Sequence, residues 1–219
     1  MPPWKGLKGA MEEATVSGGD RIGALPDALL HHILSFLPSR EAVRTCLVAR
    51  RWVDLWKSAT ALSIVGDDGK EPEPFDDVWE FVDHLLLLRG RSPIDTFELR
   101  VSGVAIDVGR VLLWIRHAVL CNVLQIQLCF ADDPPVRPWP DGPALVVVSE
   151  HLTRLELRGL MFNDEFLNFS RCPSLQYLRI DYCNFLEANR ISSQSLKHLT
   201  VSDKPALTSG LFVSFRTKV

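Results

Sequence analysis

The sequence predicts a small α-helical head followed by an irregular α/β repeat array, a solenoid of short strands and returning segments. Apolar residues recur at helical spacing near the N-terminus, and a short apolar pattern recurs five times from residue 94 onward. An acidic, proline-containing stretch separates the two regions. We therefore expect four segments: a disordered lead-in at 1–20, the head at 21–58, a linker with a helix at 59–93, and repeats at 94–219.

Residues 21–58 have the pattern of three short helices. Pro26 suits the first turn of a helix because proline has no N–H to leave unbonded. The first predicted helix carries the apolar residues Leu29, Leu30, Ile33, Leu34 and Leu37. The second is expected to point Val43, Cys46 and Leu47 inward, and the third carries Val48, Trp52, Leu55 and Trp56 on one face. So small a unit cannot hide all these side chains, and the remainder predicts a surface that binds a partner.

The segment between the head and the repeats is acidic. Eight carboxylates accompany a single lysine within residues 67–83, which indicates a solvated linker that runs into a helix. We expect that helix to extend from Phe75 to Leu88, with Gly90 and Pro93 ending it.

The repeats share the pattern apolar-x-x-apolar-x-apolar. It occurs as Ile94, Phe97, Leu99; Val123, Ile126, Leu128; Leu152, Leu155, Leu157; Leu175, Leu178, Ile180; and Leu196, Leu199, Val201. Successive starts are 29, 29, 23 and 21 residues apart, close to the period of leucine-rich repeats. Each unit supplies one strand whose apolar face is covered only when neighbours stack. A helix is predicted from Ile106 to Leu120 and a proline-rich surface loop at 132–143.

Composition excludes several classes of protein. The net charge is −3, from 24 basic and 27 acidic residues, which lacks the strong basic excess of a nucleic-acid binder. Five cysteines without a CxxC motif predict buried, reduced thiols and hence a reducing compartment. No apolar run is long enough to span a bilayer, so we expect a soluble protein of the cytoplasm, the nucleus or both.

Two stretches resemble a known family. The run from Leu25-Pro26-Asp27 through Pro38, continued by Arg50-Arg51-Trp52 and Leu55-Trp56, resembles an F-box. The stretch FVDHLLLLRGRSPIDTFEL at 81–99 resembles the segment that opens the repeats of plant F-box/leucine-rich-repeat proteins, including the F-box/FBD/LRR type. Only Cys183 conforms to the repeat consensus that places Asn or Cys after each strand, so the array is irregular. We expect the chain to lack the further C-terminal domain of that type, while a complete array, a truncated one and a variant product all stay open.

The resemblance implies a non-catalytic subunit of a Skp–cullin–F-box ubiquitin ligase. Its head would bind the Skp-type adaptor and, through it, a cullin, while the repeats would hold the target protein. The adaptor-binding residues that it implies are Leu25, Pro26, Leu29, Leu30, Ile33, Leu34, Leu37, Val43, Trp52 and Trp56. Leu25, Pro26, Ile33, Leu34 and Trp52 are the strongest candidates, although the sequence does not divide core from interface. No cofactor, metal, nucleic acid or membrane is expected as a ligand.

Two other classes of function stay open. The chain could be a repeat scaffold without a role in ubiquitin transfer, its head serving as a packing or dimerisation unit. An enzyme would need an activated group, and no cysteine or paired carboxylate has a convergent partner in the sequence. The target protein, a small-molecule co-ligand and the choice between nucleus and cytosol are not set by the sequence.

Overall fold

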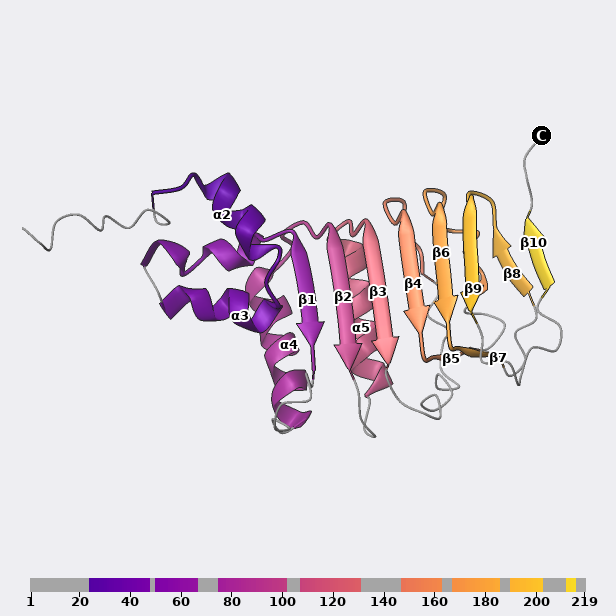
Figure 1. Cartoon of the computed structure of the whole chain (residues 1–219), viewed down its shortest axis with the longest axis horizontal. Helices are drawn as coiled ribbons and strands as arrows, with labels where there is room; N and C mark the ends of the chain where they lie inside the picture. Colours follow the sequence, from indigo (N-terminus) through magenta and orange to yellow (C-terminus); the bar gives the residue numbers. More distant parts are fainter. Residues whose placement is uncertain are drawn as a thin grey trace, which may run out of the picture.

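A computed structural model describes residues 24–47, 50–66, 75–101, 107–130, 147–162, 167–185, 190–202 and 212–215. Its centre is one parallel sheet with the strand order β1-β2-β3-β4-β6-β9 (Figure 1). The strands are β1 (Ala61–Val65), β2 (Thr96–Val101), β3 (Gln125–Phe130), β4 (Arg154–Arg158), β6 (Tyr177–Asp181) and β9 (His198–Ser202). The five predicted repeats thus place their strands side by side in chain order.

The head lies beyond β1, at one end of the sheet (Figure 1). It contains the helices α2 (Asp27–Leu34) and α3 (Ser39–Arg44). The predicted second helix ends at Arg44 and continues as the short 3₁₀ turn η1 (Thr45–Leu47). Where the sequence predicts a third helix, the described residues form two more such turns, η2 (Arg50–Trp52) and η3 (Leu55–Ser58). A 3₁₀ turn repeats every three residues, so Trp52 and Leu55 reach the same core without a continuous α-helix.

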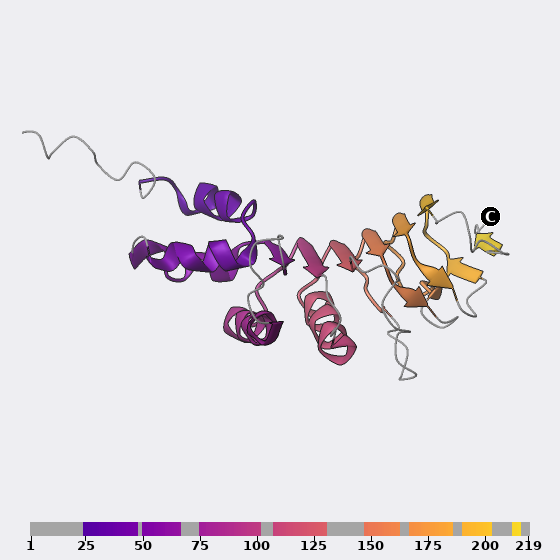
Figure 2. The ribbon, with the colours of Figure 1, turned by 60° about the horizontal axis from the view of Figure 1, so that its bottom comes forward.

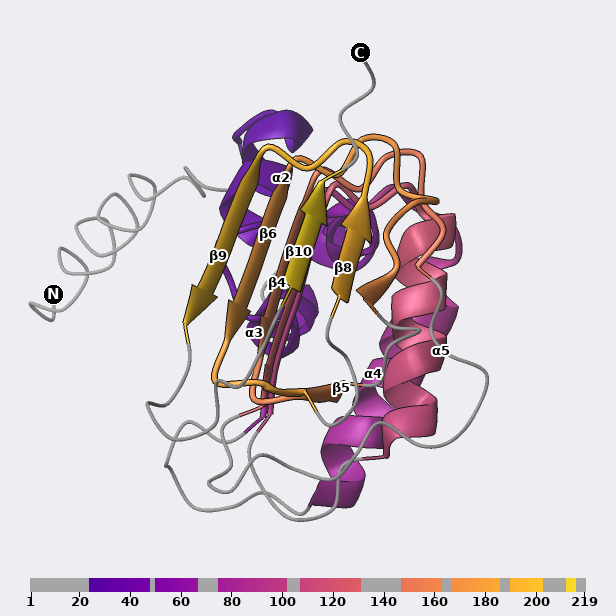
Figure 3. The same ribbon diagram turned by 90° about the vertical axis from the view of Figure 1, so that its right-hand side faces the viewer.

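Alternation along the strands separates a buried face of the sheet from an open one. Phe97, Ile126, Leu155 and Leu178 stand opposite one another in register, and all four are buried. The helices α4 (Phe75–Arg89) and α5 (Val108–Leu120) cover this face (Figure 2). Farther along, the strands β8 (Arg190–Ser193) and β10 (Phe212–Phe215) lie on the same side as the helices (Figure 3). The short strands β5 (Met161–Phe162) and β7 (Asn184–Phe185) pair with each other.

Several boundaries differ from the sequence predictions. Residues 61–65 were expected in a linker but form β1, because Leu62 and Ile64 alternate into the core and the strand pairs with β2. The helix α4 ends at Arg89 and is followed by Gly90 at a φ of 59°, as a glycine end signal predicts. The helix α5 begins two residues later than expected. The predictions for 1–20, the linker at 67–74 and the loop at 132–143 lie outside the described residues.

The thiols only partly follow the prediction. All five cysteines are free, and Cys121, Cys172 and Cys183 are buried. Cys46 and Cys129 are only partly buried, so the expectation of burial is wrong for these two. Cys129 has an outward position on β3. The sequence does not reveal this position, because the residues around Cys129 are apolar. Among the described residues, no helix has the length and apolar character needed to cross a membrane.

A buried arginine joins the head to the sheet. Arg89, the last residue of α4, donates from Nη1 to the carbonyl of Trp56 at 2.7 Å and from Nη2 to the carbonyl of Ala59 at 2.6 Å. The same Nη2 approaches the carbonyl of Pro93 at 3.5 Å. Burial of this guanidinium lowers its pKa to about 10, so it is charged at neutral pH. One side chain therefore ties the end of the head to the end of α4 and approaches the loop that leads into β2.

We expect Arg89→Ala to loosen this junction. The change removes a charged donor from two carbonyl oxygens, which should lower the free energy of unfolding by about 2–4 kcal/mol. Urea unfolding followed by tryptophan fluorescence measures this value. Arg91→Ala is the matched control because Arg91 is exposed two residues away, and its effect should stay within about 0.5 kcal/mol. Equal stability of the two variants would contradict the role given to Arg89.

Candidate functional site

The helix α2 and the turn that follows it carry two apolar stripes, one buried and one exposed. Leu30 and Leu34 are completely buried in the core of the head. The exposed stripe contains Leu29 and Ile33, each one residue before a buried leucine, and Phe36, two residues after Leu34. Their exposed fractions are 49%, 40% and 74%. We call these three residues the α2 stripe. Three large apolar side chains on one small surface indicate a contact with another polypeptide.

The structure divides the residues predicted to bind an adaptor into three groups. The exposed ones are Pro26, Leu29 and Ile33. The half-buried ones are Leu25, Leu37 and Val43. The buried ones are Leu30, Leu34, Trp52 and Trp56. The predicted adaptor contacts of the last group stay predictions, but in this structure those side chains form the internal core of the head.

Three exposed side chains of the head are missing from the predicted set. Leu47 is 85% exposed, Val53 is 46% exposed and Phe36 belongs to the α2 stripe. Phe36 lies three residues after Ile33 and seven after Leu29, so helical spacing alone could have added it. Leu47 was expected to point inward, and its exposure corrects that expectation. It sits in the turn η1, where the α-helical spacing on which the expectation rested does not apply.

Polar contacts hold α2 in place. Arg51 pairs with Asp27 at 2.5 Å, which joins the start of α2 to the turn η2. Ser58 Oγ lies 3.3 Å from His31 Nε2, which joins the middle of α2 to η3. The exposed stripe is therefore presented from a helix that is fixed on its opposite side.

The second candidate surface is the open face of the sheet, formed by the strand residues that point away from α4 and α5. Its polar side chains form rows across the strands, because the strands pair in register. One row contains Ser63, Glu98, Gln127, Glu156, Arg179 and Thr200. The next row contains Val65, Arg100, Cys129, Arg158, Asp181 and Ser202. The two rows are two residues apart, or about 6.7 Å along each strand.

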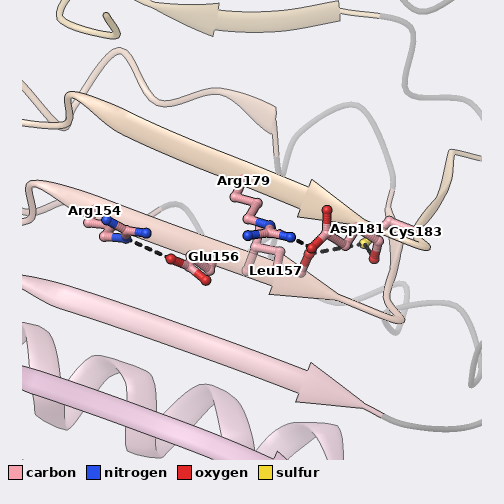
Figure 4. Close-up of polar contacts among 6 residues, drawn as sticks. All are labelled: Arg154, Glu156, Leu157, Arg179, Asp181 and Cys183. Atoms are coloured by element: carbon pink, nitrogen blue, oxygen red, sulfur yellow. Dashed lines mark hydrogen bonds and ion pairs between the residues drawn. The ribbon is translucent and has the colours of Figure 1, made fainter. Parts of the chain in front are cut away.

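Ion pairs between side chains of the same strand fix the directions of the charged groups on this face (Figure 4). Arg154 Nε bonds Glu156 Oε1 at 2.6 Å on β4, and Arg179 Nε bonds Asp181 Oδ2 at 2.6 Å on β6. The hydrogen bond and the charge of Asp181 raise the pKa of the Arg179 guanidinium. Glu156 also stands opposite Arg179 across the two strands. The guanidinium groups of both pairs are exposed and their carboxylates are more deeply buried, and the pairs fix the directions of the charged groups.

Aromatic rings extend the same surface. Tyr177 on β6 stacks on His198 of β9 with ring centroids 4.5 Å apart and an interplanar angle of 7°. The Arg154 guanidinium lies 5.8 Å from the centroid of the Tyr177 ring. Tyr177 is 44% exposed, which leaves part of this stack accessible to a partner.

A hollow of about 290 Å³ opens on this face over β2, β3, β4 and β6. Its lining includes Arg100, Cys129, Glu156, Arg158 and Asp181. The hollow is polar and shallow, and nothing in it resembles a nucleophile beside a base. Among the described residues, no group of three histidines, cysteines or carboxylates lies close enough together to hold a metal ion. The polar lining suits the binding of a polar segment.

Comparison with known proteins finds a domain family that matches the head alone and relatives that match most of the chain. Residues 22–60 match the F-box domain. An F-box/LRR-repeat protein of Arabidopsis thaliana is 33% identical over 172 residues, which cover 74% of this chain and 31% of that protein. A second one is 34% identical over 185 residues, which cover 74% of this chain and 28% of that protein. An F-box/FBD/LRR-repeat protein of the same plant is 30% identical over 193 residues, which cover 84% of this chain and 40% of that protein.

These matches confirm the resemblance seen in the sequence, but they cover only part of each relative. The chain spans less than half the length of each of these three proteins. No solved structure matches the chain.

Two adjacent leucines test the division of α2 into a buried and an exposed stripe. Leu30→Ala should lower the free energy of unfolding by about 2–5 kcal/mol because it leaves a cavity in the head. Leu29→Ala removes the same atoms from the solvent side and should change it by less than about 0.5 kcal/mol. Thermal and urea unfolding of both variants measure the difference. If Leu29→Ala is the more damaging change, the assignment of the two stripes is reversed.

Proposed function

We propose that this chain, which carries an F-box domain and is homologous to F-box/LRR-repeat proteins of Arabidopsis thaliana, is the substrate-recognition subunit of a Skp–cullin–F-box ubiquitin ligase. F-box domains generally bind Skp-type adaptors, and F-box/LRR proteins generally act in substrate recognition and are typically non-catalytic. The observation that carries the proposal for this chain is the exposed α2 stripe on an otherwise well-packed head.

The α2 stripe supplies the affinity for the adaptor. Leu29, Ile33 and Phe36 lose contact with water when a partner covers them, and burial of large apolar side chains contributes about 1.5–3 kcal/mol for each. Leu47 and Val53 enlarge the apolar area that the head exposes. The buried residues Leu34 and Trp52 act beneath the surface, since they hold α2 and its neighbouring turns in position.

The sheet supplies the surface for the target protein. In this proposal it is a leucine-rich-repeat solenoid at 94–219 that comes after the F-box at 21–58 and the linker and helix at 59–93. The five in-register repeats and the relatives' names support this division. The polar open face is the accessible side, because α4 and α5 and, farther along, β8 and β10 lie on the other side (Figures 2 and 3).

The mechanism is non-covalent. A target held on the open face stays near the conjugating enzyme that the adaptor and a cullin bring to the complex, which raises the effective concentration of the target's lysines. The Arg89 junction matters here because a loose connection between head and sheet would spread the target over many positions. The complex would act in the cytoplasm, the nucleus or both.

Adaptor binding gives the direct test. The double change Ile33→Ala and Phe36→Ala should weaken binding of a purified Skp-type adaptor at least about tenfold, since it truncates two interface anchors. Isothermal calorimetry with the full chain measures the Kd. The matched control is Leu113→Ala with Leu120→Ala on α5, where the exposed fractions of 60% and 64% are similar but the surface is not part of the head.

The outcomes separate the two main functions. Loss of binding in the α2 variant, with normal binding in the α5 control, supports the adaptor role. A folded wild-type chain that does not bind any Skp-type adaptor would contradict that role and favour the repeat scaffold. Equal loss in both double variants would show that the α2 stripe is not the docking surface.

A further inference from the structure

The hollow on the open face has a neutral floor between charged walls. The floor is β3, whose outward residues Gln127 and Cys129 carry no formal charge. On one side, Arg100 of β2 stands opposite Cys129, and on the other side Arg158 of β4 does the same. Two arginines therefore flank one small side chain, with their Cα atoms two strand spacings apart, or about 10 Å.

The two arginines differ in their partners. Arg100 Nη2 pairs with Glu98 Oε1 at 2.5 Å, and Glu98 Oε2 also accepts a hydrogen bond from Ser63 at 2.7 Å. Arg158 has no carboxylate within ion-pair distance among the described residues. Its guanidinium lies 5.0 Å from the centroid of the Tyr182 ring. Arg158 is therefore a cation whose direction is fixed by an aromatic ring and whose donors are available.

The opposing carboxylate does not neutralise Arg158. Asp181 stands opposite it on β6 but bonds Arg179 through Oδ2. Its other oxygen, Oδ1, is buried and receives no hydrogen bond from the described residues. Of the three arginines in the lining, Arg100 is paired with Glu98 and Arg179 with Asp181, so Arg158 is the cation that a carboxylate ligand would complement. The nearby Glu156 and Asp181 make the site poorer for a doubly charged anion than for a single carboxylate.

We propose that this hollow binds an acidic side chain from an extended segment of the target protein, with its carboxylate between Arg158 and Arg100 above Cys129. Arginine forks bond carboxylates through two parallel N–H groups, which sets the direction as well as the charge of the ligand. The Gln125 and Gln127 amides lie two residues apart along β3 and suit the backbone of a segment that runs along the strand. The inference rests on the proposed role of the open face as the target surface.

A peptide selection tests this inference without knowledge of the target. The probe is a phage-displayed library of random 12-residue peptides, selected on the immobilised full chain. We expect the selected peptides to contain Asp or Glu at one aligned position. The most enriched peptide is then synthesised in its acidic form and in the form with Gln or Asn at that position. Fluorescence polarisation should give a Kd at least tenfold weaker for the neutral form.

A charge exchange locates the contact. Arg158→Glu should raise the Kd of the acidic peptide at least tenfold. A peptide with Lys in place of its acidic residue should regain binding to this variant. The matched control is Arg116→Glu, because Arg116 is an exposed arginine on α5, on the other side of the sheet. It should leave the affinity unchanged. The circular dichroism spectrum of each variant should match that of the wild-type chain.

The thiol in the floor gives an independent readout. Bound peptide should slow alkylation of Cys129 by iodoacetamide several-fold and leave the rate at the partly exposed Cys46 of the head unchanged. Mass spectrometry of the digested chain resolves the two residues. Protection of Cys46 instead of Cys129 would place the peptide on the head and overturn the inference.

Three other results would also overturn it. These are no acidic preference among the selected peptides, equal weakening by Arg158→Glu and Arg116→Glu, or a phosphoserine at the acidic position that binds tenfold tighter than Glu. The last result would identify a phosphate site in place of a carboxylate site. Arg158→Glu should still bind the adaptor normally. A failure of adaptor binding by the wild-type chain would therefore reject the ligase role and leave the peptide result standing.

Discussion

The in-register pairing of parallel strands is the constraint on which the rest of this structure depends. Register places Phe97, Ile126, Leu155 and Leu178 in one buried row, and the same pairing places their polar neighbours in rows on the opposite face. A slip of one residue in any strand would exchange the two faces. The burial of apolar side chains thus also determines which charged groups stand beside one another on the open face.

The two candidate surfaces depend on one rigid connection. The α2 stripe lies at the end of the molecule beyond β1, and the open face extends from β1 to β9 (Figure 1). Arg89 bonds carbonyl groups of the head from the end of α4, while Arg40 of the head lies 5.3 Å from the centroid of the Phe81 ring on the same helix. The proposed role of bringing a target to a second protein needs such a fixed geometry, because the reach between the partners would decide which lysines are modified.

The open face gains specificity from charge order rather than from apolar area. Its arginines and carboxylates alternate along β4, and on β6 they have the opposite order, so that Glu156 stands opposite Arg179 and Arg158 opposite Asp181. The ion pairs within the strands, Arg154 with Glu156 and Arg179 with Asp181, hold these charged groups in fixed directions. A partner with the wrong charge order would leave ionised groups unpaired, which is a strong basis for rejection.

The sequence by itself determined the two periodicities, the end of α4 at Gly90, the strand positions of the five repeats and the family resemblance. It could not determine the strand β1, the 3₁₀ turns of the head, the exposure of Leu47 and Cys129, or which stripe of α2 is buried. Periodicity is a property of one segment, and it places Leu29 and Leu30 on the same broad apolar surface. Only the tertiary structure decided between them, because the exposed side is the one that no other described segment of the chain covers.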